Sequence, residues 1–204
     1  MTRASASFGK MDCRVVPGNT IEGGCDFLSK HRGSIYGDGM DLIVTGAEAR
    51  WGSRTMRCAL GPAGIRADKR EGDGVTPAGR FPLRCLLYRP DRLPPPPTAL
   101  PLLPLSPADG WCDAPEDPLY NRLVRLPYGA SHERLWLADA IYDLILVIGH
   151  NDDPVRPGAG SAVFVHVARS DYAPTQGCVA LAKEDLLAVV ATAGPGDAVV
   201  VQEG

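Results

Sequence analysis

The chain has 204 residues, of which 45% are apolar and 22% charged, and its formal net charge is −3. This length and apolar content allow a sizeable hydrophobic core without a disulfide framework. The near-neutral charge, with basic clusters no larger than Lys69-Arg70, argues against a nucleic-acid-binding protein, and no apolar run is long enough to predict a membrane-spanning helix.

Residues 1–38 are rich in Gly, Ser and charged residues and show little periodicity, so we expect a poorly ordered N-terminal extension. This segment lacks the apolar stretch of a signal peptide, and Met11 and Met40 are both possible alternative starts. We expect the folded domain to span residues 39–204.

From Met40 onward, apolar runs alternate with turn residues. Strands are predicted at "MDLIVTG" (40–46), "TMRCALG" (55–61) and "RFPLRCLLY" (80–88), with turns at 72–74 and 76–79 before the third strand. The Pro-dense segment at about 90–109 predicts an extended surface excursion inside the domain, because Pro cannot donate to a central ladder. A linker between two domains is the alternative.

The C-terminal half contains the clearest elements. "YDLILVIGHN" (142–151) and "SAVFVHVA" (161–168) predict strands, and the first is apolar nearly throughout, which favours a central position. "KEDLLAVVATA" (183–193) predicts a helix with Glu184 and Asp185 in its first turn, and "DAVVVQ" (197–202) predicts a closing strand. Many strands and about one helix indicate a mainly β fold, sandwich-like or barrel-like.

His166 and Cys178 are the candidate catalytic pair. Strand alternation places Phe164 and His166 on one face of 161–168, and a rigid strand is a good mount for a general base. Gly177 allows close backbone approach before Cys178, whose thiol becomes a nucleophile when an imidazole takes its proton. The backbone amides of Gly177 and Cys178 could face an oxyanion. These parts suffice for acyl transfer, although a buried structural His and Cys would show the same spacing.

The other cysteines carry no such pattern. The six cysteines are widely and irregularly spaced and no CxxC pair occurs, so we predict neither a zinc site nor a dithiol redox centre. We expect Cys58, Cys85 and Cys112 to be small buried apolar residues.

Two motifs resemble the L,D-transpeptidase catalytic domain. In "HVARSDYAPTQGCVAL" (166–181) the family's His, Ser or Thr, Gly and nucleophilic Cys fall on His166, Thr175, Gly177 and Cys178, with Gln176 at the variable position. The family's block GDG-x-TP-x-G-x-F matches Gly72 to Phe81, where we expect an architectural role because its residues are those of turns. The resemblance covers about Met40 to Gln202.

The resemblance implies an L,D-transpeptidase-like, mainly β catalytic domain with about one helix after Cys178. It implies an enzyme of the cell envelope or periplasm that acts on peptidoglycan stem peptides without cofactor or metal, and we expect a monomer that binds no nucleic acid. Cys178 would form a thioester as D-alanine leaves, His166 would carry the proton, and a second stem peptide would complete a 3-3 cross-link. Candidate substrate contacts are His150, Asn151, Thr175 and Gln176.

Several alternatives stay open. Water as acceptor would give an L,D-carboxypeptidase, and a D-amino acid would give an exchange enzyme. Another cysteine peptidase or amidase would share the chemistry up to the thioester, and a peptide- or glycan-binding module without catalysis could keep the same residues. The sequence does not identify the third group that orients His166, for which a backbone carbonyl would serve.

Overall fold

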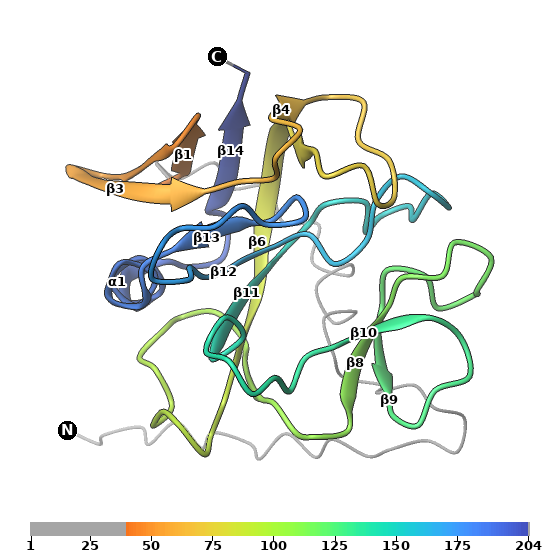
Figure 1. Cartoon of the computed structure of the whole chain (residues 1–204). Helices are drawn as coiled ribbons and strands as arrows, with labels where there is room; N and C mark the ends of the chain where they lie inside the picture. Colours follow the sequence, from red (N-terminus) through yellow and green to blue (C-terminus); the bar gives the residue numbers. More distant parts are fainter. Residues whose placement is uncertain (1–39, 204) are drawn as a thin grey trace, which may run out of the picture.

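The computed structural model describes residues 40–203, so the predicted extension at 1–38 lies outside the described residues. The described part is mainly β, as predicted, and contains one helix (Figure 1). Its elements are β1 (Leu42–Thr45), β2 (Glu48–Trp51), β3 (Arg54–Ala59), β4 (Ile65–Arg66), β5 (Thr76–Pro77), β6 (Gly79–Tyr88), β7 (Leu102–Pro104), β8 (Asp109–Cys112), β9 (Leu123–Arg125), β10 (His132–Arg134), β11 (Leu144–Ile148), β12 (Phe164–Val167), β13 (Val179–Leu181), α1 (Lys183–Thr192) and β14 (Ala198–Gln202).

The main sheet closes on itself as a barrel. Its strand order is β11-β12-β13-β3-β2-β1-β14-β6-β7, and the second-last strand, β6, also pairs with the first, β11, which closes the sheet. The long strand β6 makes this closure possible, because its first half pairs with β14 and its second half with β11. Closure removes most exposed sheet edges, which otherwise invite pairing with other chains.

The long apolar runs form the predicted elements. Strands β1, β11, β12 and β14 fall within four of the six predicted ranges, and β3 and β6 each begin one residue before the remaining two. All residues of β11 are buried and it lies between β12 and β6, which confirms the central position expected for 142–151. Strand β2 was not predicted, since its four residues alternate between exposed and buried positions over too short a length to stand out.

Helix α1 confirms the prediction at 183–193 and covers one face of the barrel wall. Its residues Leu186, Val189 and Val190 are buried, and the helix packs against β11 and β12. Glu184 and Asp185 lie in its first turn, where carboxylates interact favourably with the helix dipole.

Strand β12 separates two hydrophobic clusters. Val163, Val165 and Val167 belong to the cluster that contains the apolar face of α1. Phe164 belongs to a second cluster with Trp111, Tyr142 and Cys178, so the predicted alternation of faces is confirmed. This second cluster lies toward the small sheet β10-β8-β9, which stands beside the barrel (Figure 1).

The structure also locates the Pro-dense segment and the other cysteines. The Pro-dense segment 90–109 contains β7, which pairs with β6, and leads directly into β8. Cys58, Cys85 and Cys112 are buried, as expected, but Cys85 is disulfide-bonded, which the spacing of the cysteines did not predict. Within the described residues, no helix has the length and apolar character needed to cross a membrane.

Candidate active site

The register of two neighbouring strands brings His166 and Cys178 together. Strands β12 and β13 are parallel, with Val165 opposite Val179 and His166 opposite Ala180. Cys178 immediately precedes β13, so its side chain projects from the same sheet face as His166, one same-face position along the next strand. Neighbouring strands lie about 4.8 Å apart, which places the thiol and the imidazole beside one cavity.

The thiol is held by backbone groups. Cys178 Sγ donates to the Ala162 carbonyl at 3.2 Å and accepts from the Phe164 amide at 3.3 Å. Ala162 takes a φ of 50°, an unusual value for a residue with a Cβ, and this turns its carbonyl at the entry to β12. In this structure the thiol proton therefore points at a carbonyl oxygen, and it must turn before it can pass to an imidazole.

His166 is oriented by a backbone carbonyl rather than by a carboxylate. Its Nδ1 donates to the Val167 carbonyl at 3.0 Å, and its ring meets the Tyr142 ring edge-on with centroids 5.4 Å apart. Because a carbonyl only accepts, Nδ1 carries the proton and Nε2 keeps its lone pair. The tautomer is the one that a general base requires.

Both groups are neutral at rest. Burial raises the pKa of the Cys178 thiol to about 12, and the nearby carboxylate of Glu133 adds to this shift. Burial lowers the pKa of His166 to about 4, against a favourable contact with the Val167 carbonyl. A thiolate–imidazolium pair is therefore not preformed.

A cavity of about 220 Å³ opens onto these two residues. It is lined by Lys69, Glu71, Gly72, Asp113, Glu133, Ile141, Tyr142, Ser161, Ala162, Val163, His166, Arg169, Ala173, Pro174, Thr175, Gln176, Cys178 and Ala180. Two of the candidate substrate contacts, Thr175 and Gln176, are thus in the cavity wall.

The other two candidate contacts, His150 and Asn151, are not among the residues that line the cavity. His150 Nε2 contacts the Ala159 carbonyl at 3.1 Å, and burial lowers the pKa of this imidazole. Asn151 Nδ2 donates to the carbonyls of Arg156 and Gly160, at 3.0 Å each. Both side chains support the loop that precedes Ser161.

Thr175 and Gly177 shape the turn before the thiol. Thr175 Oγ1 donates to the Cys178 carbonyl at 2.7 Å and accepts from the Gly177 amide at 3.1 Å. Gly177 has a φ of 128°, and a Cβ built there would lie 2.6 Å from the Val75 carbonyl oxygen. A glycine is required at this position, and its amide is already engaged by Thr175 Oγ1.

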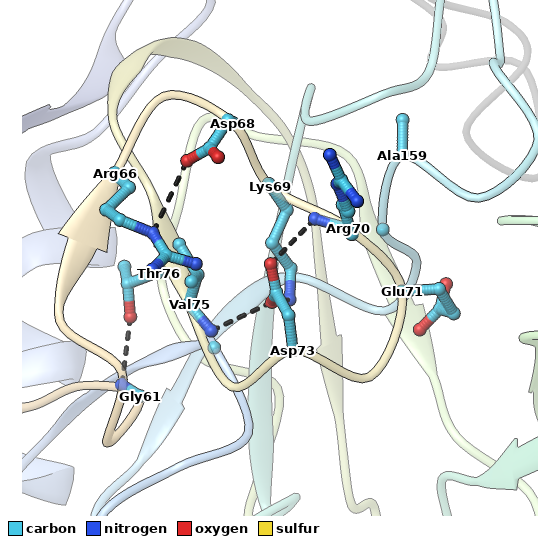
Figure 2. Close-up of polar contacts among 12 residues, drawn as sticks. Gly61, Arg66, Asp68, Lys69, Arg70, Glu71, Asp73, Val75, Thr76 and Ala159 are labelled. Carbon is cyan, nitrogen blue, oxygen red and sulfur yellow. Dashed lines mark hydrogen bonds and ion pairs between the residues drawn. The ribbon is translucent and has the colours of Figure 1, made fainter.

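The block from Gly72 to Phe81 packs against the turn that precedes Cys178. Asp73 accepts hydrogen bonds from the amides of Arg70 and Val75 and from Lys69 Nζ (Figure 2). Thr76 Oγ1 accepts from the amide of Gly61, a residue whose Cβ would approach Gly177 Cα to 3.1 Å (Figure 2). The contacts agree with the architectural role expected of this block.

Five polar residues in and around the cavity were missed by sequence reasoning. Tyr142 donates its hydroxyl to Glu133 Oε1 at 2.5 Å, and burial raises the pKa of both groups. Glu71 accepts from the hydroxyls of Tyr120 and Ser161. These residues carry no local pattern, since separate loops and strands deliver them, so nothing in the sequence distinguishes them from ordinary polar residues.

Asn121 was also missed, and it ties three segments of the site together. Its buried Oδ1 accepts from Trp111 Nε1 at 2.9 Å and from the Ala162 amide at 3.1 Å. Its Nδ2 donates to the carbonyls of His150 and Asn151, at 3.0 and 2.8 Å. The side-chain amide of Asn121 thus makes all four of its hydrogen bonds. The bond from the Ala162 amide fixes Ala162, whose carbonyl accepts from the Cys178 thiol.

Replacing Asn121 should destabilise the domain. We expect Asn121→Ala to lower the free energy of unfolding by about 3 kcal/mol, because it leaves buried donors of Trp111 and Ala162 without partners. Urea denaturation monitored by tryptophan fluorescence measures this loss. Asn151→Ala is the matched control, since its hydrogen bonds are largely exposed and should contribute less. Equal losses in the two variants would contradict the role given to Asn121.

The chain matches known proteins as follows. The family model described as YkuD, the L,D-transpeptidase catalytic domain, matches residues 44–201. Among solved structures, the chain is similar to the crystal structure of Mycobacterium tuberculosis L,D-transpeptidase 1, with 13% identity and a TM-score of 0.35. The similarity covers 81% of this chain and 62% of that chain, so this chain spans less than two thirds of its length. No curated protein gives a significant match to the chain.

Proposed function

Because the chain belongs to the L,D-transpeptidase catalytic domain family, we propose that it catalyses cysteine-dependent acyl transfer on peptidoglycan stem peptides. The observation that carries this proposal is the placement of Cys178 and His166 on one sheet face at a shared cavity. The family match supports the peptidoglycan-related class, and the arrangement of the two side chains supports the thioester route.

In the first half-reaction, Cys178 Sγ attacks the carbonyl that joins the L-centre of a diamino acid to a terminal D-alanine. The thiol proton passes to His166 Nε2, whose lone pair is available because Nδ1 donates to the Val167 carbonyl. The carbonyl oxygen becomes an oxyanion facing the Cys178 amide. The C–N bond then breaks, the proton on His166 moves to the departing nitrogen, and D-alanine leaves a thioester on Cys178.

The neutral resting pair fits this order of events. A buried thiol whose pKa is about 12 stays protonated at neutral pH, which slows its reaction with stray electrophiles. His166, with a pKa of about 4, is unprotonated and ready to accept. The proton moves as the Sγ–carbon bond forms, so the protein never holds an isolated thiolate in its interior.

In the second half-reaction, an amine of another stem peptide attacks the thioester and forms a 3-3 cross-link. His166 takes the proton that the amine loses and returns a proton to the sulfur as it leaves. Water in place of the amine would make the protein an L,D-carboxypeptidase, with the same first half-reaction.

The test is incubation of the protein with a muropeptide whose tetrapeptide stem ends in D-alanine, read by mass spectrometry. We expect free D-alanine, a cross-linked dimer and a protein adduct on the peptide that contains Cys178. D-alanine without dimer would assign the carboxypeptidase reaction instead. The absence of both D-alanine and adduct would contradict acyl transfer on stem peptides.

A further inference from the structure

Lys69 places a buried positive charge in the wall of the cavity that contains Cys178. Its side chain is only 5% exposed, and its Nζ forms an ion pair with Asp73 Oδ1 at 2.5 Å (Figure 2). Lysine side chains are almost never buried to this extent unless they are paired, and buried charges in clefts are frequently functional. The proposed reaction, as described above, gives this ammonium group no role.

Two glycines allow the Lys69 side chain to reach the neighbourhood of the nucleophile. A Cβ built on Gly160 would lie 2.9 Å from Lys69 Cγ, and a Cβ built on Gly177 would lie 3.3 Å from Lys69 Nζ. The aliphatic stem therefore passes beside Gly160, and the ammonium group ends beside Gly177, the residue that precedes Cys178. Larger residues at these two positions would displace the side chain.

The ion pair fixes the ammonium group and leaves it donors to spare. An ammonium has three N–H donors, and among residues 40–203 Asp73 Oδ1 is the one acceptor that Nζ contacts. Asp73 is itself held in place by the amides of Arg70 and Val75 (Figure 2). Nζ is thus positioned by a rigid turn and can donate to a further acceptor in the cavity.

The charge of Lys69 acts on the reacting sulfur. Burial and Glu133 raise the pKa of the Cys178 thiol, whereas the Phe164 amide and Lys69 lower it. A cation that favours a negative charge on the sulfur also favours the oxyanion that forms on the carbon bonded to that sulfur. Arg169, the other basic residue of the cavity wall, has a half-exposed side chain, so solvent screens its charge more strongly.

We propose that Lys69 is a catalytic residue whose ammonium group donates to the oxyanion that forms when Cys178 attacks a substrate carbonyl. This inference rests on the proposed function and deepens it, because it adds a charged donor to the backbone amide of Cys178. A charge-assisted hydrogen bond is roughly twice as strong as a neutral one, and a preorganised donor in a shielded site needs no reorganisation during the reaction.

Two reagents that modify the same sulfur separate this role from a general effect on the thiol. p-Nitrophenyl acetate passes through an oxyanion: the Sγ–carbon bond forms, the thiol proton passes to His166, the ester C–O bond breaks and p-nitrophenolate leaves. Iodoacetamide forms an Sγ–carbon bond with loss of iodide and the thiol proton, and no oxyanion arises. The ratio of the two rates at Cys178, followed by mass spectrometry of the peptide that contains it, therefore reports on the oxyanion alone.

Lys69→Met keeps the length of the stem and removes the ammonium group. We expect acylation of Cys178 by p-nitrophenyl acetate to fall by at least about a hundredfold, the effect of losing one oxyanion donor. Alkylation by iodoacetamide should fall much less, so that the ratio of the rates drops by at least about tenfold. Equal falls in the two rates would mean that Lys69 acts only on ionisation of the thiol, and unchanged rates would mean that it does not act on Cys178; either result would overturn the proposal.

Lys183→Met is the matched control. Lys183 lies at the start of helix α1, outside the cavity wall, and forms an ion pair with Asp143 at 3.0 Å. The change removes the same charge and should leave the ratio of the rates within about twofold of the wild type, because a screened charge away from the cavity contributes little. A fall in the ratio as large as that of Lys69→Met would show that any lost cation has this effect, and it would count against a specific role for Lys69.

A double variant separates loss of the donor from damage to the turn. Lys69→Met leaves Asp73 without its ammonium partner, so Lys69→Met/Asp73→Asn removes both charges together. The same fall in the ratio is expected, and a wild-type ratio in the double variant would trace the effect to the unpaired carboxylate and overturn the proposal. The free, buried thiols of Cys58 and Cys112 should label as slowly as in the wild type, and their faster labelling in both variants would count against the catalytic role.

Turnover of a tetrapeptide muropeptide distinguishes failure of this inference from failure of the proposed function. Lys69→Met should lower kcat for release of D-alanine by at least about a hundredfold with little change in KM, because the oxyanion exists only after attack. A raised KM with unchanged kcat would make Lys69 a ground-state binding group and reject the inference, as would equal release by the two proteins. If the wild type releases no D-alanine while the ratio of the labelling rates still falls in Lys69→Met, the proposed reaction is rejected and the role of Lys69 stands.

Discussion

Cys178→Ala is expected to abolish release of D-alanine while the domain still folds. The sulfur forms the covalent bond of the proposed reaction, so turnover should fall below about one ten-thousandth of the wild type. The change removes one buried atom that contacts the Ala162 carbonyl and the Phe164 amide. We expect a loss in the free energy of unfolding of about 1 kcal/mol, which leaves the barrel folded.

The control for this experiment is Cys58→Ala. Cys58 is a free, buried thiol that lies outside the cavity and contacts the Gly46 carbonyl, and its pKa is likewise raised by burial, to about 11. This variant should keep wild-type turnover and should still gain the mass of an acyl group on Cys178. Full turnover by folded Cys178→Ala protein, verified by circular dichroism, would refute the assignment of the nucleophile.

His166→Gln is expected to reduce turnover by about a thousandfold, the typical contribution of a positioned general base. Glutamine approximates the size of the imidazole and can still donate to the Val167 carbonyl, but it offers no basic nitrogen to the thiol. Formation of the thioester, followed in a single turnover, should be the step that slows. An unchanged rate of thioester formation in this variant would exclude His166 as the base.

The same residue should make stability depend on pH. The folded-state pKa of His166 is about 4, below its ordinary value of 6.5, so the unfolded chain binds the proton more tightly. The stabilisation is therefore fully present above about pH 6.5 and is lost as the pH falls through 4, with a total of about 3 kcal/mol. Urea denaturation at pH 7 and pH 4 should show a larger loss for the wild type than for His166→Gln. Parallel losses in the two proteins would contradict this assignment.

The sequence by itself determined the elements whose patterns are long enough to be unambiguous. The apolar run of β11 and the alternation in β12 set both strands and the faces of their side chains. The helical spacing of Leu186, Val189 and Val190 set α1. Strands of two or three residues, such as β5 and β9, were not predictable, because so short a stretch adopts extended structure only when a partner strand is present.

The motif that contains His166 and Cys178 and the block from Gly72 to Phe81 were enough to recognise the family, and the first of them named the candidate pair. Their juxtaposition depends on the parallel register of β12 with β13, which the closed barrel sets. The sequence left the group that orients His166 unidentified, and only the fold identifies it as the carbonyl of Val167. His150 and Asn151 resembled groove residues, yet the structure places both in the support of a loop.

The protonation states of the site residues and the set of carboxylates that line the cavity depend on the tertiary structure. Charge states in an interior depend on burial and on neighbours that are distant in the chain, which no local pattern encodes. Glu71, Asp113 and Glu133 meet only because the small sheet and the turn before β5 fold against the barrel. The sequence thus determined which types of residue are available for the chemistry. The protonation states of these residues and the electrostatic character of the cavity depend on the packing around them.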